Sequence, residues 1–428
     1  MEIKKLAPSR WLKIIPLVFI TYSLAYLDRA NYSFGAASGL AKDLNITAAS
    51  SSLLGALFFL GYFFFQIPGA TYAANKSAKK LVFWCLILWG LCAAATGMVT
   101  DIKFLYMIRF TLGVVESAVM PAMLIFLSNW FTKGERSRAN TFLILGNPVT
   151  VLWMSIVSGY LVHGVGWRMM FIIEGAPSII WAFFWWKLVK NKPREVKWLS
   201  EDEKNEVEKA LLDEQKGIKE VKNYREAFKN PKVIMLSIQY FFWSIGVYGF
   251  VMWLPSIIKN AGNTGIVAAG WLSAVPYLLA VIMMLSVSYY ADRTMNRKGV
   301  VWICLLIGAI CFYGSYLIGP SNFWLSYTLL VVAGGAMYAP YGPFFAIIPE
   351  LLPRNVAGGA MALINSFGAL GSFVGSYIVG YLNDSTGSPD ASYMFMALAL
   401  VASVIMTLVV KPSSSTVPNN TIALNLKK

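Results

Sequence analysis

Two pairs of charged residues lie inside apolar stretches of this sequence, where ionisable side chains are rare. Asp28 and Arg29 are adjacent in the run 14–36, which holds no other charge. Arg109 and Glu116 are seven residues apart in the run 104–127, so a helix places them on one face. A charge at mid-bilayer depth costs about 2.5–3.5 kcal/mol on insertion scales, and such residues usually line a polar path or bind something. These pairs predict a functional site inside a membrane.

The composition also indicates a membrane protein. Of 428 residues, 57% are hydrophobic and 13% charged, and the mean hydropathy is +0.59, which is more apolar than a soluble domain of this size. We therefore expect an all-α integral membrane protein with twelve spans, each long enough to cross about 30 Å of hydrocarbon. The expected spans are residues 14–36, 50–74, 81–100, 104–127, 141–163, 169–189, 233–256, 267–290, 299–319, 323–349, 357–381 and 392–410.

Lys and Arg are concentrated in alternate loops. They cluster before the first span, in the loops near 76–80, 133–138 and 293–298, and at the C-terminal end, while the intervening loops hold single basic residues or none. Because basic loops tend to stay in the cytoplasm, both termini are expected there, in a bacterial inner membrane. The net charge of +15 follows from this asymmetry. Since the basic residues are not gathered on one folded face, no nucleic-acid partner is expected.

One long polar segment divides the spans six and six. Within it, Ser200 followed by Glu203 resembles a capping box and predicts a helix at 200–216. The segment is interpreted as a cytoplasmic tether, and a regulatory or partner-binding role stays open. The expected units are 1–189, a first six-helix half; 190–232, a cytoplasmic linker; 233–410, a second six-helix half; and 411–428, a cytoplasmic tail.

The two halves look like repeats of one another. Cys85 and Cys92 recur 219 residues later as Cys304 and Cys311, and the loops that precede them match at an offset of about 218. Parallel six-span halves place a substrate site at the midplane between them, and rocking of the halves opens it to each side in turn. Two cysteines seven residues apart on a helix are separated by about 10.5 Å, so packing is expected rather than a disulfide. No metal or cofactor motif is found, and no cofactor is expected.

Several stretches resemble a known transporter family. Asp292-Arg293, followed by further basic residues, resembles the loop signature of the major facilitator superfamily, and the stretch 19–32 (FITYSLAYLDRANY) is similar to the first helix of sugar-acid transporters. Longer passages at 54–69, 137–159 and 338–380 resemble bacterial 2-ketogluconate transporters. The chain is thus identified as a member of that superfamily, in its anion:cation symporter branch. The resemblance implies two pseudo-symmetric six-helix halves and a gating loop at Asp292 and Arg293.

The resemblance also implies roles for the buried charges. Asp28 and Glu116 match the proton-linked acids of sugar-acid symporters, and Arg29 matches the residue that holds the substrate carboxylate. From the residues themselves, Glu116 is expected to lack a permanent cation partner and so to be protonated part of the time. We also expect Arg29 to hold substrate well only when Asp28 is protonated, because an ionised neighbour would compete for the guanidinium.

Other readings of these charges stay open. The alternative for Asp28 and Arg29 is that they neutralise other buried groups and hold helices together. Arg109 is interpreted as a supporting charge of the site, with the alternative that it lies near the membrane edge and extends to water.

Polar residues on other helices are candidates for sugar contacts. Tyr22, Tyr26, Arg29 and Ser33 recur at helical spacing and form one polar stripe. The resemblance implies that Tyr62 lies at the substrate, whereas Gln66, one turn later, has interhelical bonding as an equal alternative. Asn147 and Asn365 are predicted to contact sugar hydroxyls from the two halves, with helix packing as the alternative. His163, the only histidine, is interpreted as a surface residue.

The sequence thus predicts a monomeric proton-coupled symporter that imports a sugar acid anion by alternating access, with 2-keto-D-gluconate as the first candidate. Another sugar acid, such as galactonate or a hexuronate, and an uncoupled facilitator are the alternatives, and sodium in place of protons stays open. An enzyme is disfavoured because no reactive constellation is found. A channel or receptor is disfavoured because it needs neither paired titratable groups nor repeated halves.

Overall fold

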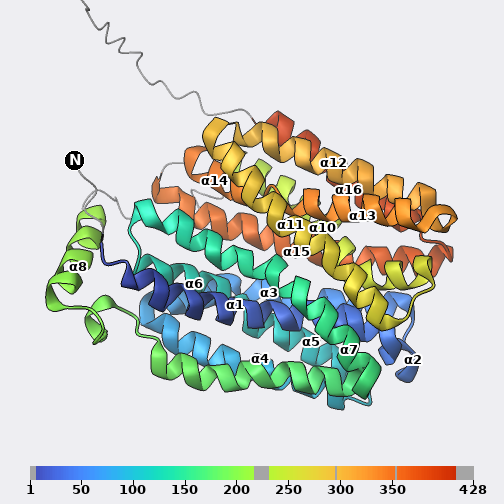
Figure 1. Cartoon of the computed structure of the whole chain (residues 1–428), viewed down its shortest axis with the longest axis horizontal. Coiled ribbons are helices and arrows are strands. Elements are labelled where there is room, and N and C mark those ends of the chain that lie inside the picture. The colour runs from blue at the N-terminus through green and yellow to red at the C-terminus, as the bar shows by residue number, and fades with distance from the viewer. Residues whose placement is uncertain (1–5, 216–230, 295, 352–353, 411–428) are drawn as a thin grey trace, which may run out of the picture.

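The computed structural model describes residues 6–215, 231–294, 296–351 and 354–410, and every regular element in these ranges is a helix (Figure 1). The helices of the first half are α1 (Ser9–Gly35), α2 (Ala41–Asp43), α3 (Ala48–Tyr72), α4 (Ala78–Met98), α5 (Ile102–Ser117), α6 (Val119–Ser128) and α7 (Lys133–Leu188). Those of the second half are α10 (Pro231–Gly262), α11 (Ile266–Thr294), α12 (Arg297–Ile318), α13 (Phe323–Tyr338), α14 (Tyr341–Leu351), α15 (Arg354–Thr386) and α16 (Asp390–Val409). The expected all-α class is confirmed.

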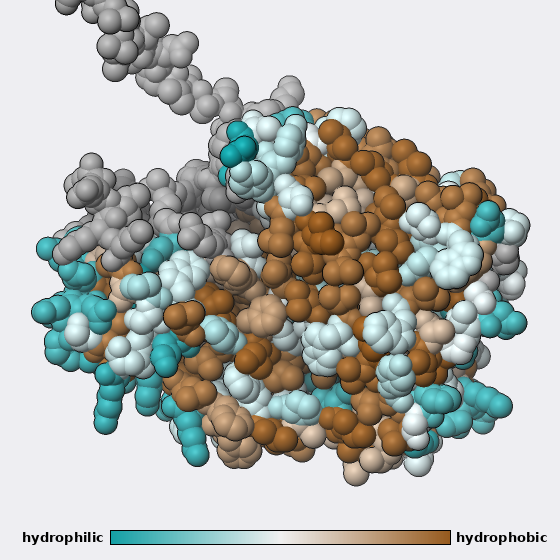
Figure 2. Space-filling view, in the orientation of Figure 1, coloured by the Kyte–Doolittle hydropathy of each residue, from teal (hydrophilic) through white to brown (hydrophobic). Residues whose placement is uncertain are grey.

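The outer surface matches a lipid environment. Figure 2 shows a broad hydrophobic face in the middle of the molecule, with hydrophilic residues at its two ends. Many large apolar side chains lie on the outside of the helices, among them Trp84, Phe183, Ile310 and Leu398, each more than half exposed. Eleven helical stretches in the described residues are long and apolar enough to cross a bilayer. The chain is a multi-pass membrane protein.

The difference between twelve expected spans and eleven apolar stretches lies in α7. Its apolar part, Ala139–Leu188, has 50 residues, which at 1.5 Å per residue is more than twice the thickness of the hydrocarbon core. The helix is broken at Gly166, whose φ of 80° is a left-handed value that favours glycine. The expected spans 141–163 and 169–189 therefore meet at this glycine, and α7 comprises two crossings.

The fourth span of each half, expected as one continuous run, is split. In the first half α5 ends at Ser117 and α6 begins at Val119, so the break lies at Ala118, two residues after Glu116. In the second half α13 ends at Tyr338 and α14 begins at Tyr341. Membrane transporters commonly form their substrate sites at such interrupted helices, because irregular backbone at membrane depth is tolerated where it lines a cavity.

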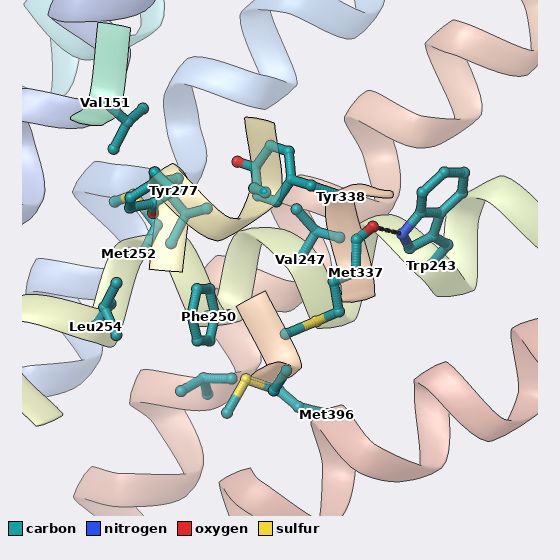
Figure 3. Close-up of a cluster of buried hydrophobic side chains, with 14 of the residues drawn as sticks. Val151, Trp243, Val247, Phe250, Met252, Leu254, Tyr277, Met337, Tyr338 and Met396 are labelled. Atoms are coloured by element: carbon teal, nitrogen blue, oxygen red, sulfur yellow. Dashed lines mark hydrogen bonds between the residues drawn. The ribbon is translucent and has the colours of Figure 1, made fainter. Parts of the chain in front are cut away.

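One hydrophobic core contains buried side chains of both halves, and a second lies almost wholly within the first half. In the second half, aromatic and sulfur-containing side chains of α10, α13 and α16 pack together, and the indole of Trp243 donates to the carbonyl of Met337 over 3.0 Å (Figure 3). The halves meet through α3 against α15 and through α7 against α11. At the end of the bundle opposite the N-terminus, Lys259 of α10 donates to the carbonyl of Ala37 over 2.8 Å.

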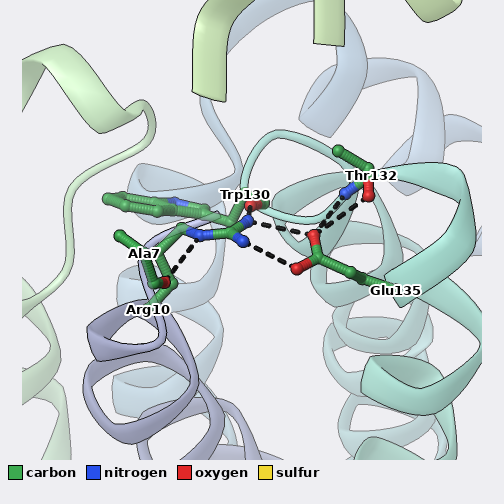
Figure 4. A network of polar contacts seen from close by, with 5 residues as sticks. All are labelled: Ala7, Arg10, Trp130, Thr132 and Glu135. Atoms are coloured by element: carbon green, nitrogen blue, oxygen red, sulfur yellow. Dashed lines mark hydrogen bonds and ion pairs between the residues drawn. The ribbon is translucent and has the colours of Figure 1, made fainter. Parts of the chain in front are cut away.

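A polar network fastens the start of α1 to the start of α7. Arg10, fully buried, donates to the carbonyl of Trp130 over 2.6 Å and to both carboxylate oxygens of Glu135 over 2.7 and 3.1 Å (Figure 4). Thr132 donates to the same carboxylate through its backbone amide and its hydroxyl. Burial alone raises the pKa of Glu135, but the hydrogen bonds from Arg10 and Thr132 outweigh it and hold the pKa below its ordinary value of 4.5.

The linker helix predicted from the sequence is confirmed. α8 spans Glu201–Gln215, and residue 216, the predicted end, lies outside the described residues. Ser200 and Glu203 form the expected reciprocal cap, with the Glu203 amide bonded to the Ser200 hydroxyl over 3.2 Å and the Ser200 amide to the Glu203 carboxylate over 2.8 Å. Trp198 stacks on Trp130 at 5.6 Å, so this helix is anchored against the first half.

Candidate functional site: a polar cavity between the halves

A small cavity of about 50 Å³, partly open to solvent, lies between the two halves. A space of this size admits water molecules in the conformation described. Seven helices supply its walls, four from the first half and three from the second. The lining residues are Tyr22, Arg29, Phe59, Tyr62, Met120, Ile144 and Asn147 of the first half, and Tyr240, Tyr248, Tyr341, Phe345, Asn365, Gly368, Ala369 and Ser372 of the second.

Arg29 is the one charged residue among those that line this cavity. Its guanidinium lies within 5.2 Å of the ring centres of Tyr26, Phe58 and Tyr62, so aromatic faces hold the cation from three sides. One terminal nitrogen donates to Glu116 over 3.0 Å, while the Nε atom is buried without a hydrogen-bond partner in the described structure. A guanidinium is suited to bind carboxylate or phosphate groups.

The ion pair with Arg29 corrects the expectation that Glu116 has no full-time cation partner. Glu116 is fully buried and bonds the guanidinium through one carboxylate oxygen, while its other oxygen has no partner among the described residues. The break between α5 and α6, at Ala118, follows two residues later. The two residues come from different helices, and nothing in the sequence spacing indicated that they would pair.

Arg109 does not form the pair with Glu116 that the seven-residue spacing suggested. Its Nε donates to the carbonyl of Leu54 over 3.2 Å, and its guanidinium lies over the Tyr32 ring at 4.6 Å. The side chain is 1% exposed, so the alternative of an arginine extended to water at the membrane edge is wrong. Its charge acts on both Glu116 and Asp28.

Asp28 lies behind the cavity rather than on its wall. The side chain is 1% exposed, and neither carboxylate oxygen has a hydrogen-bond partner in the described structure. The charges that act on it are those of Glu116, Glu174 and Arg109. The expected competition between Asp28 and substrate for Arg29 is therefore corrected, because the carboxylate in contact with this guanidinium is Glu116.

The other predicted contact residues divide into two groups. Tyr22, Tyr62, Asn147 and Asn365 all line the cavity, as the sequence suggested for substrate contacts. Tyr26 does not; its hydroxyl lies 3.4–3.5 Å from those of Tyr338 and Tyr248 in the second half. Tyr26 is thus part of the seam between the halves.

The cavity retains the internal repeat of the sequence. Asn147 and Asn365 lie 218 residues apart, as do Tyr22 and Tyr240, and all four side chains line the cavity. At an offset of 219 residues, the positions of Asp28 and Arg29 correspond to Val247 and Tyr248. The two halves therefore offer matching polar and aromatic groups, but only the first offers a cation there.

A scan of family models matches the chain to the one described as Major Facilitator Superfamily, over residues 18–376 and 268–425. The chain belongs to the Major Facilitator Superfamily. Its members are transporters, so this protein is a membrane transporter and not an enzyme.

Named relatives match almost the full length of this protein. It is 31% identical over 94% of its length to a putative tartrate transporter of Agrobacterium vitis, 90% of which is covered. It is 22% identical over 94% of its length to a hexuronate transporter of Bacillus subtilis, 95% of which is covered. Among solved structures, a bacterial homologue of the human lysosomal transporter Spinster, in an inward-facing and occupied conformation, matches with a TM-score of 0.72 and 16% identity, covering 94% of this chain and 96% of that one.

Two further sequence predictions concern residues that do not line the cavity. The side chain of Asp292, in the predicted gating loop, lies outside the described residues, while Arg293 is exposed and stacks over Tyr289 at 4.6 Å. Gln66 bonds Ser366 of the second half over 2.8 Å, which favours its reading as a bond between helices. His163 is exposed, as expected.

The sequence analysis missed one buried acid of this protein and most of the second-half residues that line the cavity. Glu174 is 4% exposed on the second part of α7 and is near Asp28. It is the one acidic residue in the expected span 169–189, so the signal that singled out Asp28 was present for it also. Tyr240 and Ser372 carried no comparable signal, because tyrosines and serines are common in packed membrane helices.

Proposed function

We propose that this protein is a proton-coupled symporter that imports a sugar acid anion, with 2-keto-D-gluconate as the first candidate. The observation that carries the proposal is Arg29, which faces a cavity between two rocking halves while a titratable carboxylate, Glu116, holds one of its donors. A cation that is shared between a protein acid and the cavity is suited to exchange one carboxylate for another.

The coupling follows from that exchange. When Glu116 is ionised, it occupies Arg29 and competes with the substrate carboxylate. When Glu116 takes up a proton, its attraction for the guanidinium weakens and Arg29 is released to the substrate. Asp28 is proposed as a second proton site, since its carboxylate is buried near Glu116 without a hydrogen-bond partner in the described structure.

Coupling to protons also answers an electrical problem. Importing a monoanion against a membrane potential that is negative inside costs about 2.3 kcal/mol per 100 mV. One accompanying proton cancels this cost, and a second adds the potential as a driving force. Two acids near the cation, Asp28 and Glu116, provide for either case.

The uncharged walls favour a polyhydroxylated substrate. Asn147 and Asn365 face the cavity from opposite halves, and amide groups hydrogen-bond hydroxyls both as donors and as acceptors. Aromatic rings of Tyr22, Tyr62 and Tyr248 offer apolar faces to the C–H groups of a sugar backbone. Relatives named as tartrate and hexuronate transporters agree with a hydroxylated acid. Galactonate or a hexuronate is therefore the alternative substrate, and an uncoupled facilitator is the alternative mechanism.

The remaining topology is proposed on the same basis. Basic loops favour cytoplasmic termini in a bacterial inner membrane. The units 1–189, 190–232, 233–410 and 411–428 are proposed as first half, linker, second half and tail of a monomer. Asp292 and Arg293 are proposed to act in gating at the cytoplasmic ends of the helices.

The test is uptake into vesicles that contain the purified protein. Labelled aldonates, 2-ketoaldonates, uronates and tartrate are compared at two pH values, with and without an uncoupler. We expect saturable accumulation of a 2-ketoaldonate that is driven by an inward proton gradient and abolished by the uncoupler. Glu116→Gln and Asp28→Asn are each expected to retain substrate exchange and to lose accumulation.

The control for these variants is Ser403→Ala, a neutral substitution at a buried site of the second half. It removes the hydrogen bonds between Ser403 and Gln239, neither of which lines the cavity. It is expected to accumulate substrate as the wild type does. Undiminished accumulation by both Asp28→Asn and Glu116→Gln would reject proton coupling through these acids. Equal uptake with and without the uncoupler in the wild type would favour the uncoupled facilitator.

A further inference from the structure

Met120 lines the cavity, and the proposed symport gives it no role. It is the second residue of α6, directly after the break in the fourth span. Pro121 follows it and, because proline has no backbone N–H, cannot donate to the carbonyl of Ser117 as a continuous helix requires. The local sequence therefore favours an interruption here, and Met120 lies on the cavity immediately after it.

The sulfur of Met120 lies between polar groups of the two halves. The Tyr22 hydroxyl of α1 donates to it over 3.6 Å, and the Asn365 side-chain amide of α15 donates to it over 3.9 Å. Both donors belong to residues that line the cavity, and Tyr22 is 3% exposed. A thioether is a weak acceptor, whereas the oxygen of a hydroxyl accepts well. A substrate hydroxyl between these donors would therefore be a better partner for both than the sulfur is.

The cavity must enlarge to admit a sugar acid. Its volume is about 50 Å³, which is room for water, and a sugar acid is several times larger than a water molecule. Side chains of the wall must therefore move when substrate enters. Methionine is unbranched and has three rotatable bonds, so it changes shape at a lower cost than the aromatic rings beside it. Met120 is the lining side chain best suited to move.

The second half has an alanine at the corresponding point. Pro121 recurs 219 residues later as Pro340, which lies between α13 and α14, so the interruptions of the two fourth spans correspond. At the same offset Met120 corresponds to Ala339, which is fully buried. The flexible side chain at this break is thus a feature of the first half, while one of its two donors comes from the second half.

We propose that Met120 is a displaceable residue that makes the site select hydroxylated acids. Its sulfur holds Tyr22 and Asn365 in position, and a hydroxyl of the substrate takes its place between them. The exchange is favourable because oxygen is the stronger acceptor for both donors. An acid that lacks this hydroxyl leaves the sulfur in place and gains no such bonds. The inference deepens the proposed symport and rests on it, and it identifies the wall side chain that yields to the sugar.

The first experiment observes Met120 by NMR in lipid nanodiscs. All 18 methionines carry a ¹³C-labelled methyl group, and the Met120 signal is identified by its loss in Met120→Leu. Without any acid, Tyr22→Phe and Asn365→Ala are each expected to shift this signal, because each removes a donor to the sulfur. Addition of 2-keto-D-gluconate is expected to shift it in the wild type. Met123, fully buried on the same helix and not among the lining residues, is the control signal and should not shift.

The second experiment measures the selectivity of binding. Leucine has nearly the volume of methionine but no acceptor, so Met120→Leu is expected to fold. Deoxy analogues compete with labelled 2-keto-D-gluconate for binding to the protein in nanodiscs. An analogue without the critical hydroxyl leaves the donors on the sulfur in the wild type, whereas in Met120→Leu it leaves them without that acceptor. The variant should therefore discriminate against this analogue about three- to tenfold more strongly than the wild type, which is the effect of one ordinary hydrogen bond. Met123→Leu should keep the wild-type selectivity.

The outcomes separate this inference from the proposed function. A Met120 signal that does not shift when 2-keto-D-gluconate binds, or wild-type selectivity in Met120→Leu, overturns the inference, while proton-driven accumulation by wild-type vesicles keeps the symport. Binding that shifts the signal without any such accumulation supports the inference and rejects the symport. If no acid of the uptake panel binds or accumulates, both are rejected. Should Met120→Leu unfold, Met120→Ala, which also lacks the acceptor, replaces it with the same expected results.

Discussion

The two halves of this protein share a backbone plan but differ in the chemistry of their interiors. In the described residues of the first half, the buried charged side chains are Arg10, Asp28, Arg29, Arg109, Glu116 and Glu174. In the described residues of the second half, the buried polar side chains are serines, a threonine, a glutamine and tyrosines, and none is charged. At the position that corresponds to Arg29, the second half has Tyr248.

This difference shows that one repeat carries charged groups that the described residues of the other lack. Both halves split their fourth span and place an asparagine and a tyrosine on the cavity. The first half adds a cation and acids, which in the proposed symport serve the carboxylate and the proton. Both halves supply aromatic side chains to the cavity, which the proposed symport uses for the sugar backbone. Variants that remove charge should therefore affect coupling, whereas variants of the aromatic wall should affect affinity alone.

The largest effect is expected for Arg29→Lys. A lysine keeps the charge but loses the planar fork, and truncating one member of a buried charge pair costs about 2–5 kcal/mol, so uptake should fall by about a hundredfold or more. Initial rates in vesicles measure this. Arg194→Lys, at a linker arginine that is 70% exposed, is the matched control and should keep the wild-type rate. Wild-type transport by Arg29→Lys would contradict the proposed role of the Arg29 guanidinium in binding substrate.

A smaller effect is expected from the aromatic wall. Tyr248→Leu removes a ring that packs against Phe59 at 4.6 Å and faces the cavity. Loss of one aromatic contact is worth about 0.5–1.5 kcal/mol, so the KM should rise up to about tenfold while the ratio of protons to substrate stays constant. Concentration-dependent uptake with a pH-sensitive dye measures both. Tyr381→Leu, on an exposed ring, is the control. A changed proton ratio in Tyr248→Leu would contradict the division of roles.

The symmetric asparagines sharpen the comparison further. Asn147→Ala and Asn365→Ala each remove hydrogen bonds worth about 0.5–1.5 kcal/mol net, so each should raise the KM by about three- to tenfold. A substrate that lacks one hydroxyl should be insensitive to one of the two variants, because the partner of that amide is then already absent. Competition assays with deoxy analogues measure this. If no analogue separates the two variants, the asparagines serve helix packing instead.

The smallest effect concerns stability rather than transport. Because the pKa of Glu135 is lower in the folded protein than its ordinary 4.5, its ion pair with Arg10 stabilises the fold above that pH and is lost as the pH falls through the lower folded-state value. Glu135→Gln should therefore lower the Tm in detergent at neutral pH, and the difference from the wild type should shrink as the pH falls below 4.5. A Tm difference that does not change with pH would contradict this account.

Much of the fold could be predicted because its signals are local. Apolar runs of sufficient length gave all the crossings, and the Ser200–Glu203 cap gave the linker helix, since helix formation and capping depend on neighbours within a few residues. The breaks in the fourth spans were placed only by the structure, whereas the expected spans 141–163 and 169–189 already bracketed the break at Gly166. Apolar composition does not distinguish a continuous helix from two helices joined by a short interruption.

For the site, the sequence by itself indicated that Asp28, Arg29, Arg109 and Glu116 are ionisable groups inside apolar spans, and that Arg29 lies on a polar helix face. The tertiary structure alone decided their partners. Arg29 meets Glu116 rather than Asp28, and Arg109 meets a backbone carbonyl. The reason is that periodicity along one helix fixes which side chains share a face, whereas the choice between acids on different helices depends on how those helices pack.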